Sequence, residues 1–199
     1  MTHEMFTIVL ANLVFIGVLP FVFFRRDGSF NFRWWLTGMP FFLSALAVIA
    51  GRYGYFARWS GLPDDALSTA ASLAVLGSMV MIGWTVGSHR VPLALWHQND
   101  DAPASIVNWG PYKYVRHPFY VSFLVTQIGA FLAFPHIGTL GAFGYAVVAL
   151  SLTARREEKR LLTSKLGDEY RIYMTKTGRL VPGVGRLAAN EPGPGRVAA

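Results

Sequence analysis

Hydrophobic residues gather in five long runs that polar segments separate. The runs cover residues 5–24, 34–50, 66–86, 119–134 and 137–154. The first three approach the 20 or so apolar residues that a helix needs to cross a bilayer, whereas the last two are shorter. Only Pro135 and His136 separate these two, so we expect a tight antiparallel hairpin. The pattern predicts an all-α, polytopic membrane protein with about five transmembrane helices.

Aromatic and small residues support this division of the chain. Trp34 and Trp35 open the second run and Trp59 follows its end, as interfacial anchors do. Gly83 and Gly87 stand four residues apart in the third run, a spacing that predicts close contact with a neighbouring helix.

Basic residues are distributed unevenly between the two sides of these runs. The chain has 199 residues, 53% hydrophobic and 15% charged, with a net charge of +7. With the N-terminus outside, 16 of the 18 Lys and Arg residues lie on the inner side, and only Arg52 and Arg58 lie opposite. This bias favours a cytoplasmic C-terminus. It attributes the positive charge to membrane orientation, so we expect no nucleic-acid partner.

The composition and polarity of the chain suggest three regions. We expect a three-helix membrane region over residues 1–87 and a functional core over 88–183. Residues 184–199 are expected to be a flexible tail, because its last part is rich in Pro, Gly and Ala. Cysteine is absent, which excludes disulfides and thiolate metal sites without fixing the compartment.

The most unusual stretch covers residues 110–120, where the long polar loop meets the fourth apolar run. Pro118 disfavours helical geometry at His117 and suits the first turn of the next helix. Arg116 adds a cation, and three aromatic rings surround the corner: Tyr112, Tyr114 and Tyr120. The stretch is either a ligand site or a basic interfacial anchor that starts a helix.

A helix over residues 155–174 is predicted to leave the membrane. When the residues are placed at 100° steps around a helix, Glu158 falls within an apolar arc and Glu157 falls outside it. The arc is formed by Leu161, Leu162, Leu166, Tyr170 and Tyr173. We therefore expect Glu158 to point inward and Glu157 to be solvated. Gly167 is a position where this helix could break.

Other interpretations of these residues stay open. Glu158 could be an ion-pair partner of Arg116 or Arg179 instead of a site residue. A metal site is not expected, because the upstream side chains lack a recognised ligand spacing; these are His89, His97, Asp100 and Asp101.

Together these features resemble a known family. The pattern Gly-x-Tyr-x-x-x-Arg-His-Pro-x-Tyr covers residues 110–120 and is followed by the short hairpin and the Glu157–Glu158 pair. Further matching positions are Leu161, Leu166, Gly167, Tyr170, Tyr173, Arg179 and Pro182. Over residues 108–183 the chain resembles the isoprenylcysteine carboxyl methyltransferase family and its phospholipid methyltransferase relatives. One departure is Ser122, where many members have glycine.

The resemblance implies an integral membrane methyltransferase that uses S-adenosylmethionine. It implies that the cofactor binds between the corner and the C-terminal helix, at Tyr112, His117, Pro118, Tyr120, Glu158, Tyr170 and Tyr173. It assigns the catalytic roles to Arg179, Glu158 and Arg116. The expected partners are membrane lipid and a lipophilic small-molecule or prenylated acceptor. O-methylation of a carboxylate is the expected reaction.

The residue types alone do not determine the chemical class of the methyl acceptor. A carboxylate is ionised at neutral pH and needs only orientation, which Arg179 or Arg116 would give through a forked hydrogen bond. A phenol, thiol or amine benefits from a base, and the candidates are His117 and Glu158.

Two other functional classes fit the same pattern. One is an NADPH-dependent membrane reductase of the sterol reductase type. The other is a membrane protein without catalytic activity. Titration with NADPH and with S-adenosylmethionine separates these classes from a methyltransferase.

Overall fold

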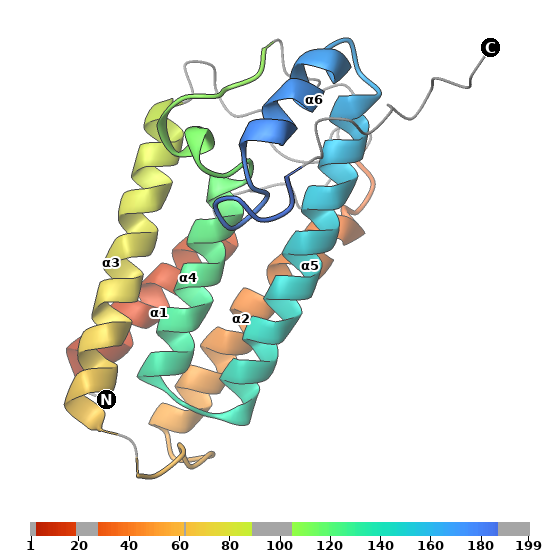
Figure 1. The fold of residues 1–199 in the computed structure, drawn as a ribbon. Helices are drawn as coiled ribbons and strands as arrows, with labels where there is room; N and C mark the ends of the chain where they lie inside the picture. The colour runs from red at the N-terminus through yellow and green to blue at the C-terminus, as the bar shows by residue number, and fades with distance from the viewer. Residues whose placement is uncertain (1–2, 19–27, 62, 89–104, 187–199) are drawn as a thin grey trace.

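The computed structural model describes residues 3–18, 28–61, 63–88 and 105–186 (Figure 1). These form α1 (His3–Val18), α2 (Phe32–Arg52), α3 (Asp64–Ser88), the short 3-10 helix η1 (Gly110–Lys113), α4 (Pro118–Ala133), α5 (Ile137–Leu162) and α6 (Gly167–Lys176). No strand forms within these ranges, and Val115 and Gly178 form an isolated bridge. The prediction of an all-α fold is confirmed.

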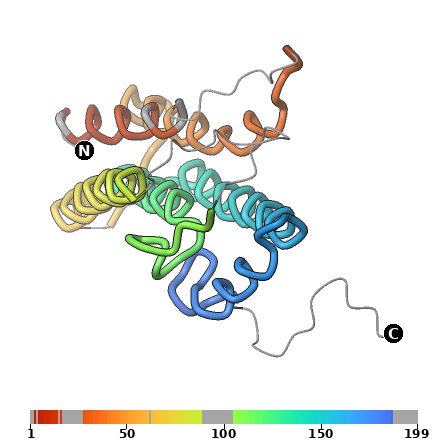
Figure 2. The backbone as a smooth tube through the Cα atoms, turned by 90° about the horizontal axis from the view of Figure 1, so that it is seen from above, coloured from red at the N-terminus to blue at the C-terminus, as the bar shows by residue number. Residues whose placement is uncertain are grey.

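The long helices form two layers, which Figure 2 shows from one end of the bundle. One layer holds α1 and α2, and the other holds α3, α4 and α5, with α4 between its two neighbours. The segment from residue 105 to η1, α6 and residues 177–186 cover one end of the second layer. This end therefore collects parts of the chain that lie far apart in sequence.

Three of these helices, α2, α3 and α5, are long and apolar enough to cross a membrane. Many large apolar side chains on their outer faces are exposed, such as Leu46 at 62%, Leu73 at 65% and Val80 at 69%. Lipid rather than water suits such faces. α1 and α4 are shorter apolar helices, so a count of five spans stays a prediction.

Close helix contact occurs at a glycine that the sequence analysis did not select. A Cβ built on Gly129 of α4 would lie 3.3 Å from Val75 Cγ2 and 3.4 Å from Ala74 Cβ of α3. Among the described residues, no heavy atom of another element lies within 4 Å of a Cβ built on Gly83 or Gly87, so the prediction of close contact there is wrong for this part of the chain. Nearer the middle of the bundle, Ser78 hydrogen-bonds Thr126 at 2.6 Å between the oxygens, which also joins α3 to α4.

The predicted hairpin between the fourth and fifth apolar runs is present. α4 ends at Ala133 and α5 begins at Ile137. The imidazole of His136 caps α5 by accepting a hydrogen bond from the Gly138 amide at 3.0 Å. The Trp59 amide donates to the Pro135 carbonyl at 2.9 Å, so the α2–α3 connection lies at the same end as this turn. That end is opposite α6 (Figure 1).

The prediction of one separate helix over residues 155–174 is wrong. α5 runs without interruption from the fifth apolar run to Leu162, and α6 starts only at Gly167. A Cβ on Gly167 would lie 2.4 Å from the Leu162 carbonyl oxygen, so the tight turn between the helices requires glycine. The turn folds α6 back, so that Leu161 and Leu162 pack against Tyr170, Tyr173 and other members of a small apolar cluster.

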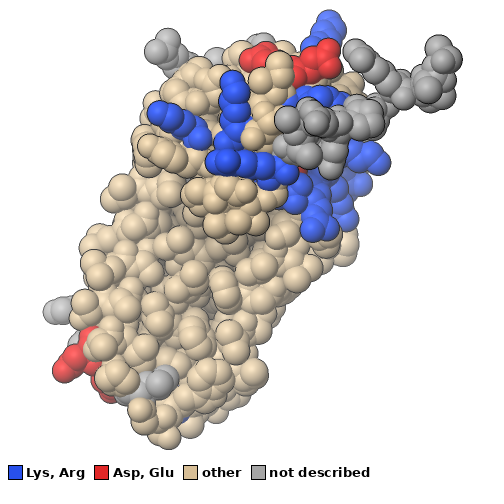
Figure 3. All heavy atoms as spheres, in the orientation of Figure 1, with Lys and Arg blue, Asp and Glu red and all other residues tan. Residues whose placement is uncertain are grey.

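Most charged residues on the face seen in Figure 3 gather at the end that carries α6, a smaller acidic group lies at the opposite end, and the body between them is almost free of charge. This agrees with the uneven charge distribution in the sequence. Which side of the membrane each end faces stays a prediction.

The absence of native cysteine allows a direct test of topology. Ser60→Cys and Lys165→Cys, made singly, place a thiol at exposed positions at opposite ends of the bundle. We expect a membrane-impermeant maleimide to label Ser60→Cys from the outside of intact cells and Lys165→Cys only after the membrane is opened. Labelling of both from one side would contradict the topology.

Candidate functional site

The corner that precedes α4 is built on the end of α3. Gly110 opens η1 with a φ of +59°, and a Cβ there would lie 2.0 Å from the Ser88 hydroxyl oxygen. The Trp109 indole donates to the Ser88 carbonyl at 2.8 Å. Pro118 then starts α4, and His117 before it has φ −125° and ψ 64°, outside the helical region as predicted.

The C-terminal segment, residues 177–186, lies alongside this corner. The Arg116 amide donates to the Gly178 carbonyl at 2.9 Å, and the His117 amide donates to the Arg179 carbonyl at 3.2 Å. A Cβ on Gly178 would lie 1.9 Å from the Val181 carbonyl oxygen, so only glycine fits the reversal that follows. This pairing brings Arg179 beside Arg116.

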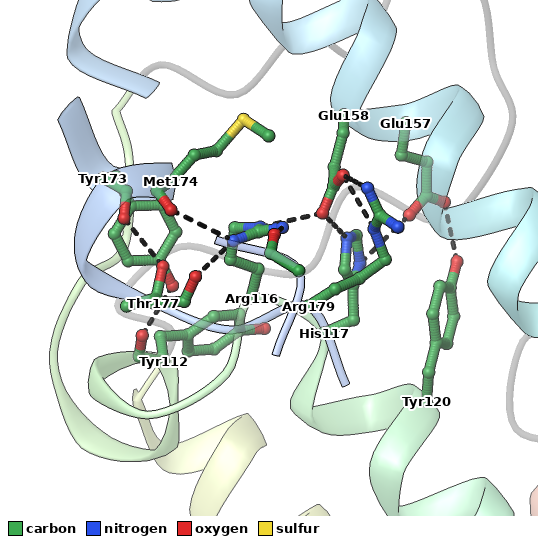
Figure 4. Close-up of polar contacts among 11 residues, drawn as sticks. Tyr112, Arg116, His117, Tyr120, Glu157, Glu158, Tyr173, Met174, Thr177 and Arg179 are labelled. Carbon is green, nitrogen blue, oxygen red and sulfur yellow. Dashed lines mark hydrogen bonds and ion pairs between the residues drawn. The ribbon is translucent and has the colours of Figure 1, made fainter. Parts of the chain in front are cut away.

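Glu158 is the centre of the resulting ionic cluster (Figure 4). Its Oε1 accepts from Arg116 Nε at 2.8 Å, and its Oε2 accepts from Arg179 Nε at 2.8 Å and Nη2 at 2.6 Å. The residue is 2% exposed, which confirms the prediction that it points inward. The alternative interpretation, an ion pair with Arg116 or Arg179, also holds, because both arginines bind it.

Arg116 joins the corner to the end of the chain. Its side chain is fully buried, and beyond Glu158 its guanidinium donates to three backbone carbonyls, those of Met174, Thr177 and Gly185. Four acceptors occupy a group with five N–H donors. This arrangement suits a residue that holds the C-terminal segment in place. It leaves no free pair of N–H groups that could bind the carboxylate of a methyl acceptor.

Glu157 faces the other side of His117. The Tyr120 hydroxyl donates to Glu157 Oε1 at 2.7 Å, and His117 Nδ1 lies 3.5 Å from Glu157 Oε2. The rings of His117 and Tyr120 stack in parallel, 3° apart in plane and 5.2 Å between centroids. The prediction that Glu157 is solvated holds only in part: its side chain is 30% exposed, because α4 packs against α5 and places Tyr120 there.

His117 therefore lies between two carboxylates. Its Nε2 is 3.3 Å from Glu158 Oε1, but this buried nitrogen has no partner with hydrogen-bond geometry among the described residues. An orphaned buried nitrogen is a group that a ligand could satisfy.

An aromatic cluster borders the ionic one. Tyr170, Tyr173 and Met174 of α6 pack with Ile106, and the Tyr173 hydroxyl donates to the Tyr112 carbonyl at 2.5 Å. Burial raises the pKa of Tyr173 to about 12, and it also raises the pKa of Tyr112 and of Tyr170. These hydroxyls stay protonated at neutral pH, so they act as donors and apolar surface rather than as bases.

The structure gathers the residues that the sequence selected at one end of the bundle. Arg116, His117, Tyr120, Glu158 and Arg179 lie in one polar network or in contact with it, and Tyr112, Tyr170 and Tyr173 border it. Sequence reasoning missed Glu157, Thr177, Gly178 and Gly185. Only Glu157 had a signal, its place in the Glu157–Glu158 pair. His89, His97, Asp100 and Asp101 lie outside the described residues.

Removing the Arg116 guanidinium should destabilise the fold. Arg116→Met leaves three carbonyls and one carboxylate oxygen buried without their donor, and breaking a buried pair typically costs about 3–5 kcal/mol. We expect a clear fall in the melting temperature of the detergent-purified protein. Arg156→Met, at an exposed position on α5, is the control and should melt like the parent. Equal melting of both variants would contradict the assignment.

Comparison with known proteins shows what this part of the chain is similar to. Residues 69–163 match the isoprenylcysteine carboxyl methyltransferase (ICMT) family model. The chain is 30% identical over 176 residues to a methanethiol S-methyltransferase of Pseudomonas sp. (strain GM41(2012)), covering 75% of this chain and 64% of that relative. It is 28% identical over 202 residues to a methanethiol S-methyltransferase of Mycobacterium tuberculosis (strain ATCC 25618 / H37Rv), covering 87% and 78%.

The chain thus spans just under two thirds of the Pseudomonas relative's length. No solved structure matches it. The matched residues include α4, the hairpin and Glu158, which carry most of the resemblance found in the sequence, so that prediction is confirmed. Both relatives and the family support the prediction of a methyltransferase. Residues 69–163 are therefore similar to the isoprenylcysteine carboxyl methyltransferase family.

Proposed function

We propose that this protein is an integral membrane methyltransferase that transfers the methyl group of S-adenosylmethionine to a small thiol. The observation that carries the proposal is the ionic cluster around Glu158, which lies at the end of long apolar helices and within the region that the family shares. The helices suit a membrane setting, and the cluster supplies the polar groups.

The residues present fit S-adenosylmethionine. Three tyrosines, the buried Tyr170 and Tyr173 and the partly buried Tyr112, would border its adenine, since aromatic faces favour stacking. His117 Nε2, buried and without a hydrogen bond among the described residues, would contact a polar part of the cofactor. Pro118 and Tyr120 would complete the site at the start of α4. When bound, the cofactor supplies an electrophilic methyl group on a positively charged sulfur.

The chain's own task is then to align the acceptor and to exclude water. Arg116 and Glu158 hold the C-terminal segment against the corner, which would fix the two sides of the site relative to one another. Positioning of this kind lowers the barrier of a displacement reaction that needs little further chemical help.

The charges of the cluster favour a neutral acceptor over a carboxylate. Glu158 binds both Arg116 and Arg179, and Glu157 lies nearby, so two positive guanidiniums face two negative carboxylates. An acceptor carboxylate would have to displace Glu158 from Arg179. A thiol carries no such requirement, and both named relatives are thiol methyltransferases. The expectation of a carboxylate acceptor is therefore the alternative that the assay must exclude.

Cofactor binding is the first test. At ~100 times its dissociation constant, S-adenosylhomocysteine should stabilise the purified protein by about 2.7 kcal/mol, because it binds only the folded chain. Thermal unfolding in detergent measures this shift. NADPH at equal concentration should give none. A shift with NADPH alone would favour a reductase, and no shift with either would favour a protein without catalysis.

The acceptor class is the second test. The purified protein with S-adenosylmethionine should convert short alkanethiols to methyl thioethers and leave fatty and prenyl carboxylates unchanged. Gas chromatography of the headspace and extracts detects both kinds of product. Formation of methyl esters, without thioethers, would show that the acceptor is a carboxylate.

A further inference from the structure

We propose that Glu157 is the residue that removes the proton of the acceptor thiol. The inference rests on the proposed function, because it applies only if a thiol is methylated. The sequence placed Glu157 on the solvated side of its helix and assigned it no role. Its contacts with Tyr120 and His117 are what give it one.

The reaction requires such a group. A thiol with a pKa near 8.5 or above is mostly protonated at neutral pH, and the thiolate is the better nucleophile. The acceptor sulfur forms a bond to the methyl carbon while the bond from that carbon to the sulfonium sulfur breaks. The electron pair of the broken bond stays on the leaving sulfur. The thiol proton moves to the Glu157 carboxylate and later to water, so each turnover releases one proton.

Glu158 cannot take this proton without breaking the cluster. Its two oxygens already accept three N–H groups from Arg116 and Arg179, and its side chain is 3% exposed. Protonation would remove the negative charge that balances the buried Arg116 and the partly buried Arg179. Glu157, in contrast, accepts a hydrogen bond from the neutral Tyr120 hydroxyl, and its side chain is 30% exposed. It can meet an acceptor and return the proton to water.

Tyr120 and His117 are positioning residues in this scheme. The Tyr120 hydroxyl holds Glu157 Oε1 at 2.7 Å, which directs Oε2 toward His117, 3.5 Å from Nδ1 (Figure 4). The parallel stacking of the two rings fixes their orientation. A proton on Oε2 leaves the hydrogen bond to Oε1 intact, so Glu157 can change its charge without losing its position.

The test compares thiols of different acidity. Glu157→Gln keeps the shape and the acceptor for Tyr120 but cannot take a proton. General-base catalysis contributes about 10²–10⁴-fold, so turnover of ethanethiol should fall at least about 100-fold. Turnover of 2,2,2-trifluoroethanethiol, which ionises more readily, should fall by less than about tenfold. Glu169→Gln, at an exposed position of α6, is the matched control and should behave like the parent.

Binding and a second variant separate the possible failures. S-adenosylhomocysteine should bind Glu157→Gln with parent affinity in the thermal assay, which shows a folded site. Glu157→Asp retains a carboxylate and should recover part of the ethanethiol turnover. Equal losses with both thiols, or no loss at all, would overturn the role of Glu157. If the parent protein methylates no thiol, the proposed function itself fails.

Discussion

The buried carboxylate of Glu158, paired with two arginines, is the interaction on which this end of the protein depends. Arg116 comes from the corner before α4, Glu158 from the end of α5, and Arg179 from the C-terminal segment. Charges removed from water need partners, so no one of these segments can leave without exposing the others to a large electrostatic cost. The cluster therefore couples three separate parts of the chain into one site.

The position of this cluster follows from the membrane. α5 carries an apolar body and ends in charged residues, so a helix that crosses the lipid also delivers two carboxylates to the polar surface. In the lipid-facing part, helix contact depends on small residues such as Gly129 and on hydroxyl pairs such as Ser78 with Thr126. The ionic cluster thus lies at the polar end of an otherwise apolar bundle.

Periodicity predicted what depends on one helix alone. Run lengths gave the apolar segments and the hairpin, and helical phase gave the inward direction of Glu158. Periodicity failed to predict features that depend on contact with a second helix. α5 continues to Leu162 and breaks before Gly167 because of a turn that α6 closes, and Glu157 is held by Tyr120 of α4. Close contact occurs at Gly129 rather than Gly83 because of how α3 and α4 are rotated about their axes. The residue pattern of neither helix specifies that rotation.

Two adjacent glutamates on one helix point about 100° apart, so they meet different neighbours. Glu158 meets fixed cations and keeps its charge, whereas Glu157 meets a tyrosine and a histidine and is free to lose its charge. In the proposed reaction, the methyl donor loses its positive charge as Glu157 loses its negative one. The net charge of the site is then the same before and after transfer. In a region of low dielectric this matters, because a reaction that left an unbalanced charge beside Arg116 and Arg179 would be opposed by the energy of burying it.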